Sequence, residues 1–221
     1  MTDDMDEKER RSAFVSAMTT EHFVLQTAIA TTINEGASRA SIYVFSVSSS
    51  LVAMGFAAQS QTAFMAFVGT VLPALFLLGV FTVLRLVDIA AENMQALIGI
   101  ARIHGYYRTL GREAEVHFAA DRGRWPEGKN QPSLRVGPLI GYLTTGASMI
   151  ASINAIVAGA GVTLLVDRLL GNGIKLALLL GGTCATILLA VFFLYQRYRI
   201  ADLVDAWERS KDSGGSADSG R

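Results

Sequence analysis

Four long apolar runs divide this chain, and each is long enough to cross a bilayer as an α-helix. The chain has 221 residues, of which 51% are hydrophobic. These residues gather in blocks, which is typical of membrane proteins. We therefore predict an all-α polytopic membrane protein, whose four transmembrane helices pair as two hairpins. The predicted spans are residues 41–58, 63–84, 139–166 and 174–195.

The polar stretch 85–138 predicts which way the protein faces. Lysine and arginine number four before the first span, eight within this stretch and five after the fourth span. The turn between the first two spans has none. Short loops rich in lysine and arginine stay on the cytoplasmic side of a membrane. We therefore expect both termini and the stretch 85–138 to be cytoplasmic.

Three of the predicted helices continue beyond the lipid. One runs from Thr19 into the first span, and another continues past Gln196 to about residue 209. After the second span, residues recur at alternating four- and three-residue spacing, which indicates an amphipathic helix with a packing seam. The seam comprises Leu86, Ala90, Asn93, Leu97, Ile100, His104 and Tyr107. We expect the three extensions to pack together as a cytosolic helical stalk.

Both ends of the chain are predicted to be disordered, because they have too little apolar surface to offset the entropy of ordering. These ends are the charged residues 1–18 and the Ser/Gly/Asp-rich residues 210–221. The charged start also lacks the apolar core of a signal peptide. The predicted membrane domain is therefore 19–209, with its cytosolic middle block at 85–138. That block has a short helix near 112–120 and a loop at 121–138.

The third span carries a face of small residues, which lets helix backbones approach closely. We predict that this helix lies at the centre of the bundle. Asn154 is the most polar side chain in the middle of a span, and an interhelical hydrogen bond is its expected role. The small face comprises Gly141, Thr145, Ser148, Ser152, Ala155 and Gly159.

Motifs that carry chemistry are missing from the sequence: it has no Walker loop, HExxH or G-x-S-x-G. Away from their ends, the predicted spans contain no ionisable residue, which argues against an ion-coupled pump. His22 and His104 could meet across the stalk and bind a metal, although their spacing is not that of a metal motif. A packed interface role for His104 is the alternative, with pH sensing possible in principle.

One part of the sequence resembles a known group of proteins. Residues 21–27, which form a polar helix start, are followed by residues 35–39 and then by the serine-rich first span, 41–58. This pattern resembles uncharacterised small four-span integral membrane proteins of actinobacteria, over roughly the first 60 residues. The resemblance implies a bacterial plasma (inner) membrane location and, because that family has no established activity, no function.

Three functions are compatible with these patterns. The leading hypothesis is a non-enzymatic membrane protein whose cytosolic helices bind a second copy or a cytosolic protein. The alternatives are a small channel, lined by Ser46, Ser49, Ser50 and Asn154, and a membrane-embedded enzyme. We predict no cofactor and no metal, and the formal net charge of +0 argues against nucleic-acid binding. The candidate packing or interface residues are Ser148, Ser152, Asn154, Ala155, Gly159, Leu97, Ile100 and His104.

Overall fold

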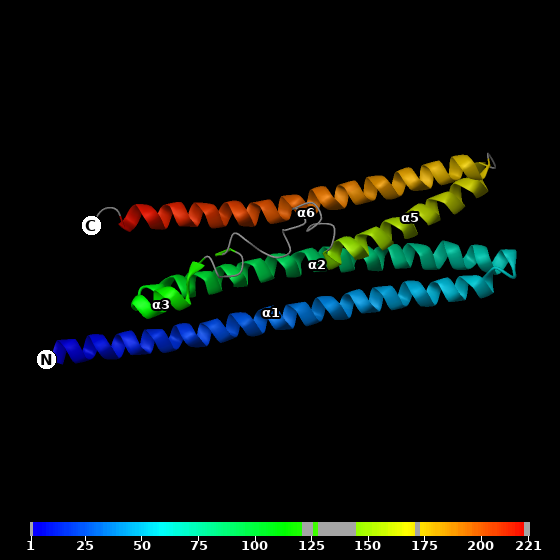
Figure 1. Cartoon of the computed structure of the whole chain (residues 1–221). Helices are drawn as coiled ribbons and strands as arrows, with labels where there is room; N and C mark the ends of the chain where they lie inside the picture. Colours follow the sequence, from blue (N-terminus) through cyan, green and yellow to red (C-terminus); the bar gives the residue numbers. More distant parts are fainter. Residues whose placement is uncertain (1, 121–125, 128–144, 171–172, 219–221) are drawn as a thin grey trace.

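The computed structural model describes residues 2–120, 126–127, 145–170 and 173–218, and this part of the chain is helical without strands. Four of its helices are long and apolar enough to cross a membrane, which makes it an α-helical membrane protein by length and composition. The helices are α1 (Thr2–Ala57), α2 (Gln61–Arg108), α3 (Arg112–His117), α5 (Gly146–Leu170) and α6 (Ile174–Asp218) (Figure 1).

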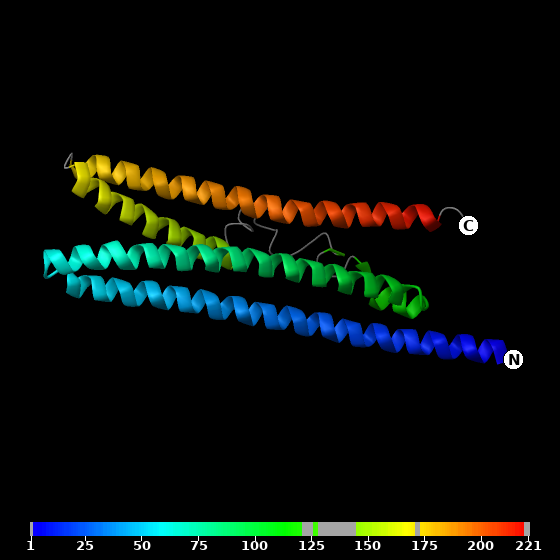
Figure 2. The same cartoon turned by 180° about the vertical axis from the view of Figure 1, so that it is seen from behind.

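The long helices run side by side with alternating directions. α1 and α2 are joined by a tight turn at which Ser60 caps α2, its hydroxyl accepting from the Ala63 backbone N–H at 3.5 Å. The α1–α2 turn, the C-terminal end of α5 and the N-terminal end of α6 lie at one end, here called the turn end (Figure 2). Both chain termini and α3 lie at the other, here called the terminal end.

Three helices extend well past α5 toward the terminal end (Figure 1). α1 has 56 residues, α2 has 48 and α6 has 45, whereas α5 has 25. At 1.5 Å per residue, 56 residues span roughly 84 Å, against about 30 Å for the hydrocarbon core of a bilayer. These helices therefore project beyond any bilayer that their apolar segments cross.

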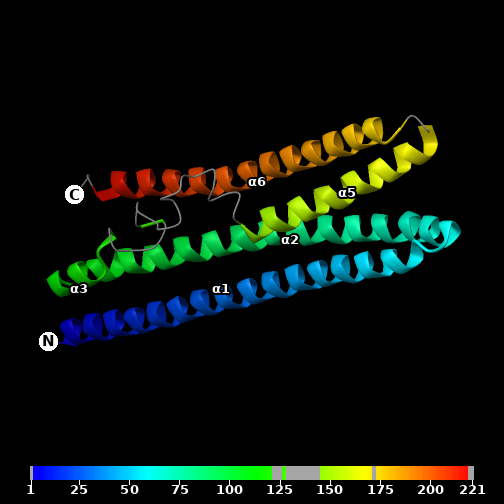
Figure 3. The same ribbon diagram turned by 45° about the vertical axis from the view of Figure 1, so that its right-hand side comes forward.

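The helices form an open row and not a closed ring. α1 packs along α2 and touches α5, but among the described residues it makes no contact with α6 (Figure 3). α5 packs between α2 and α6, and it is the most buried span: 28% of its apolar 18-residue stretch is buried, against 6% of the corresponding stretch in α1. The predicted third span is thus well enclosed, while α1 leaves one side uncovered.

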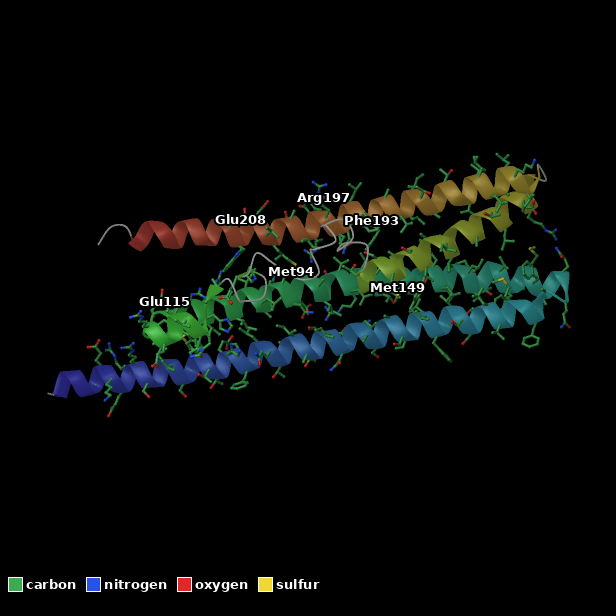
Figure 4. The ribbon with its side chains drawn as sticks, in the orientation of Figure 1. Met94, Glu115, Met149, Phe193, Arg197 and Glu208 are labelled. Carbon is green, nitrogen blue, oxygen red and sulfur yellow. The ribbon has the colours of Figure 1, made fainter. Side chains whose placement is uncertain are left out.

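The core lies near the N-terminal end of α5 and includes residues of all four long helices. Tyr43 and Ile150 are 0% exposed there. Met149 and Phe193 mark this level on α5 and α6, with Glu208 further along α6 toward the terminal end (Figure 4). The buried cluster consists of Tyr43, Val83, Val87, Ala147, Ile150, Ala151 and Phe192.

Helix boundaries differ from the sequence-based expectations at several places. α1 begins at Thr2 and not at Thr19, and α6 continues to Asp218, so the structure has helix where disorder is predicted. Residues 2–34 contain no proline or glycine, so nothing interrupts a helix that has formed downstream. α3 ends at His117, earlier than predicted, and α5 continues past Val166 to Leu170. The predicted start of the third span, at 139–144, and most of the loop 121–138 lie outside the described residues.

Candidate interaction site at the terminal end

A layer of ion pairs marks the level where the apolar parts of α1 and α2 end. Arg85 of α2 donates to both carboxylate oxygens of Glu35 on α1, at 3.0 and 2.9 Å, and also binds Glu92 at 2.7 Å. Arg39 adds a fourth contact, with its Nε 2.8 Å from Glu35. Hydrogen bonds from Arg85 and then Arg39 lower the pKa of Glu35 to about 2. Glu35 therefore stays ionised at neutral pH and fixes the register of the two helices.

A second ion pair links α2 to α6 near the same level. Arg199 Nη2 lies 2.9 Å from Asp88 Oδ1, and this hydrogen bond raises the pKa of Arg199. Both side chains are more than 40% exposed, so the pair stabilises the contact only weakly. Its main consequence is positional, because it holds the α6 extension beside α2.

Beyond these ion pairs, α1 and α2 form a two-helix seam. Half-buried α1 side chains follow the alternating three- and four-residue spacing of a coiled coil. The Thr32 hydroxyl donates to Asn93 of α2, and Leu25 packs against Gly99. The half-buried series on α1 is Val15, Met18, His22, Leu25, Ile29 and Thr32.

The predicted seam on α2 includes Asn93, which bonds to Thr32 of α1, but the most buried residues of this stretch are not members of that seam. Leu97 and Ile100 are only partly buried, whereas Ala101 and Ile103 are buried at 5% and 6% exposed. The residues that the spacing singles out are therefore not the most buried ones on this part of α2.

At the terminal end, α1, α2 and the region of α3 surround a pocket of about 380 Å³. Its walls are mainly aromatic: the ring of Phe118 lies 5.1 Å from that of Tyr107 and 5.5 Å from that of His104. The Thr19 hydroxyl lies 3.2 Å from the Tyr107 hydroxyl across the two helices. The lining residues are Thr19, His22, Phe23, His104, Tyr107, Leu110 and Phe118.

His22 and His104 do meet, with ring centroids 5.3 Å apart and planes 27° apart. Nearly parallel rings direct their in-plane lone pairs past each other, so they do not converge on one ion. Within the described residues, no group of three His, Cys, Asp or Glu side chains could hold a metal. The geometry favours an interface role for His104 over a metal-binding one.

A buried carboxylate binds one of the residues that line the pocket. Glu127, whose side chain is 8% exposed, lies 2.9 Å from His104 Nδ1 and 2.7 Å from Arg108 Nη1. Arg108 also donates to the Phe118 carbonyl at 2.9 Å. These bonds hold Phe118 and Glu127 against α2. The sequence offered no signal for Glu127, because a loop has no periodicity from which a contact can be derived.

His22 is the least satisfied polar group in this region. Its Nε2 lies 2.8 Å from Gln26 Nε2, but its buried Nδ1 has no hydrogen-bond partner among the described residues. Burial lowers the pKa of His22, and the nearby His104 lowers it further. The uncharged imidazole is therefore the form that this packing favours.

The remaining predicted packing residues lie inside the helix row. Asn154 is 6% exposed, accepts from the Tyr43 hydroxyl at 3.1 Å and sits against Gly79, where a methyl group would overlap it. Ala155 is 2% exposed. A Cβ on Gly159 would lie 2.7 Å from the Gly181 carbonyl oxygen, so α5 and α6 are in close backbone contact there.

Hydroxyl groups on α5 and α1 bond mostly within their own helix or near it. Ser152 donates to the Ser148 carbonyl at 2.8 Å, while the Ser148 hydroxyl lies 2.8 Å from Thr145 and donates to Gln196 of α6 at 3.5 Å. Of the serines expected to line a channel, Ser46 donates to the Ile42 carbonyl, Ser49 is exposed and Ser50 is partly buried. The contacts of Asn154 are instead those of a packing residue.

Comparisons with known proteins do not extend this description. No family model, curated protein or solved structure matches the chain. The class of protein therefore rests on the four apolar helices, and the function rests on the geometry of the terminal end.

Proposed function

We propose that this is a non-enzymatic integral membrane protein of the plasma membrane, which assembles with a second copy of itself through the helices at its terminal end. In this proposal the terminal end is cytosolic, as the distribution of lysine and arginine predicts. The two hairpins cross the bilayer, and the extensions of α1, α2 and α6 form the stalk.

The observation that supports this function most directly is the aromatic pocket beside an exposed aromatic side chain. Phe23 lines the pocket but is 63% exposed, and Phe14 nearby on α1 is 52% exposed. Both belong to the part of α1 that lies beyond the predicted span. Exposed large apolar groups at the rim of a pocket in water mark interaction sites.

A second copy is the occupant that this surface fits best. Two-fold contacts bring the same patch of each partner together, so the patch must be complementary to itself. A protruding Phe23 beside an open apolar pocket meets this requirement, because each copy can insert its ring into the pocket of the other. The uncovered side of α1 leaves room for the approach, since α6 does not contact it among the described residues.

The test compares the molecular mass of the assembled protein between the wild type and a Phe23 variant. Burying one large apolar side chain stabilises a contact by roughly 1.5–3 kcal/mol, and a two-fold contact buries two. Phe23→Ser should therefore weaken dimerisation by roughly a hundredfold or more. Light scattering of the full chain in detergent or nanodiscs, at pH about 8, above the range in which an ordinary histidine changes charge, should show a dimer that becomes a monomer of 23.7 kDa.

Val24→Ser is the matched control. Val24 is 55% exposed and adjacent to Phe23, but it does not line the pocket. This variant should remain dimeric. A monomeric wild type, or equal behaviour of Phe23→Ser and Val24→Ser, would contradict assembly through the pocket.

A further inference from the structure

The two imidazoles in the pocket come from different helices, and this links the charge of the pocket to the packing of α1 on α2. His22 belongs to α1 and His104 to α2, and their rings stack 5.3 Å apart. Both line the pocket, together with Phe118 and Tyr107. Any change of charge on this pair therefore acts on the contact between the two helices and on the apolar character of the pocket.

The two rings have different charged and titratable neighbours. Glu127 lies 2.9 Å from His104 and can act as its counter-ion, although Arg108 already binds the same carboxylate. α2 also contributes Tyr107, whose hydroxyl bonds Thr19. α3 contributes no charged group to the pocket, and its His117 is exposed.

His22 has no comparable support on α1. Gln26 is neutral, and the adjacent Glu21 is exposed and does not line the pocket. A positive charge on His22 would therefore lie at stacking distance from His104, with its buried Nδ1–H unpaired. Buried, unpaired charge is strongly unfavourable.

We propose that His22 and His104 form a proton-sensitive latch, which keeps α1 packed on α2 around the pocket while His22 is neutral and releases α1 there when His22 is protonated. The latch itself rests only on this geometry. Its consequence, that acid closes the site to a second copy, rests on the proposed function. A charged, separated pocket no longer offers an apolar wall to Phe23.

The direction of the pH effect follows from His22. Its pKa is lowered in the packed state, first by burial and then by His104, from the ordinary value of 6.5. The separated state therefore binds more protons than the packed state when the pH lies between 6.5 and the lowered pKa. Packing is fully stable above pH 6.5 and loses stability as the pH falls toward that lower value.

The test measures the separation of α1 and α2 in the full chain in lipid nanodiscs. Spin labels on cysteines at the exposed positions Thr20 and Arg102, in a Cys184→Ser background, report the terminal end. Between pH about 8 and about 5, the range in which histidine changes charge, a longer distance should grow roughly threefold in population. A control pair at the exposed positions Thr31 and Gln95, near the Thr32–Asn93 bond, should not change.

Histidine variants assign the response. The double variant His22→Gln, His104→Gln should abolish it, and His117→Gln, which changes an exposed histidine of the same chain, should keep it. Because the chain has three histidines, ¹⁵N-histidine NMR of the wild type gives a second readout that needs no pocket variant. The midpoint of His22 should fall below 6.5 and coincide with the change in distance.

An unchanged distance across this pH range, a response that survives the double variant, or midpoints that do not coincide would overturn the latch. These outcomes can be distinguished from those of the dimerisation test, which is done at pH about 8, above the range in which an ordinary histidine changes charge. A dimer that depends on Phe23 but shows no change of distance with pH would support the proposed assembly and contradict the latch. A pH-dependent distance in a monomeric protein would support the latch and contradict the assembly.

Discussion

The α5–α6 contact and the α1–α2 extension are both antiparallel helix pairs, but different forces hold them together. Between α5 and α6, Gly159 and Gly181 bring backbones into direct contact, and the stabilisation comes from dispersion. At the terminal end, α1 and α2 use half-buried apolar side chains, a threonine–asparagine hydrogen bond and stacked histidines. The first pair suits lipid, where apolar groups gain nothing by leaving the solvent, and the second suits water.

This difference predicts where each region tolerates change. A contact between backbones cannot accept volume, but it is insensitive to pH and to nearby charge. A contact made by side chains of mixed polarity accepts volume at its edges and responds to protonation. Regulation and partner binding are therefore expected at the terminal end, and structural rigidity at α5–α6.

The largest expected effect is on the α5–α6 contact. Gly159→Leu forces a side chain into the Gly181 carbonyl, and overpacking typically costs about 1–3 kcal/mol or more. The variant should lose its folded state in detergent, measured as a lower melting temperature or aggregation on size exclusion. Ile156 lies on the same helix and is 67% exposed, so Ile156→Leu should match the wild type. Equal tolerance at both positions would place lipid, and not α6, against Gly159.

A more local effect is expected from the buried carboxylate of the terminal end. Glu127→Gln removes the charge that Arg108 and His104 share, and loss of such a partner costs about 1–3 kcal/mol. Trypsin should then cleave the α3 region faster, while the melting of the spans stays unchanged. Glu113→Gln alters an exposed carboxylate of α3 and should have no effect. Identical cleavage of all three proteins would show that Glu127 does not hold this segment.

The sequence predicted the class of fold because hydropathy and helical spacing are local properties. Four helices, the continuation of α2 past Arg85 and the small face of α5 all follow from residue type and period. Period alone does not say which residue across a gap completes a contact. The Glu35–Arg85 pair was nevertheless accessible, because the two residues are equally distant from Ser60 in an antiparallel pair.

Other features depend on properties that composition does not carry. The helix at residues 2–18 arises because a long helix continues until something breaks it, whereas composition alone suggested disorder. The docking of Glu127 needs the path of a loop, and the open side of α1 needs the arrangement of all four helices. The meeting of His22 and His104 was considered because both lie on helices of the predicted stalk, but their stacking and the unpaired Nδ1 were not accessible from sequence.

The proposed division into a membrane region and a cytosolic region can be tested directly by cysteine labelling in intact cells. With Cys184→Ser as background, single cysteines are placed at Gln61 beside the α1–α2 turn and at Arg112 in α3, both exposed positions. An impermeant maleimide should label the cysteine at Gln61 and reach the one at Arg112 only after the cells are opened. Labelling at Arg112 in intact cells, with Gln61 protected, would place the pocket on the outer side and contradict a cytosolic site of assembly.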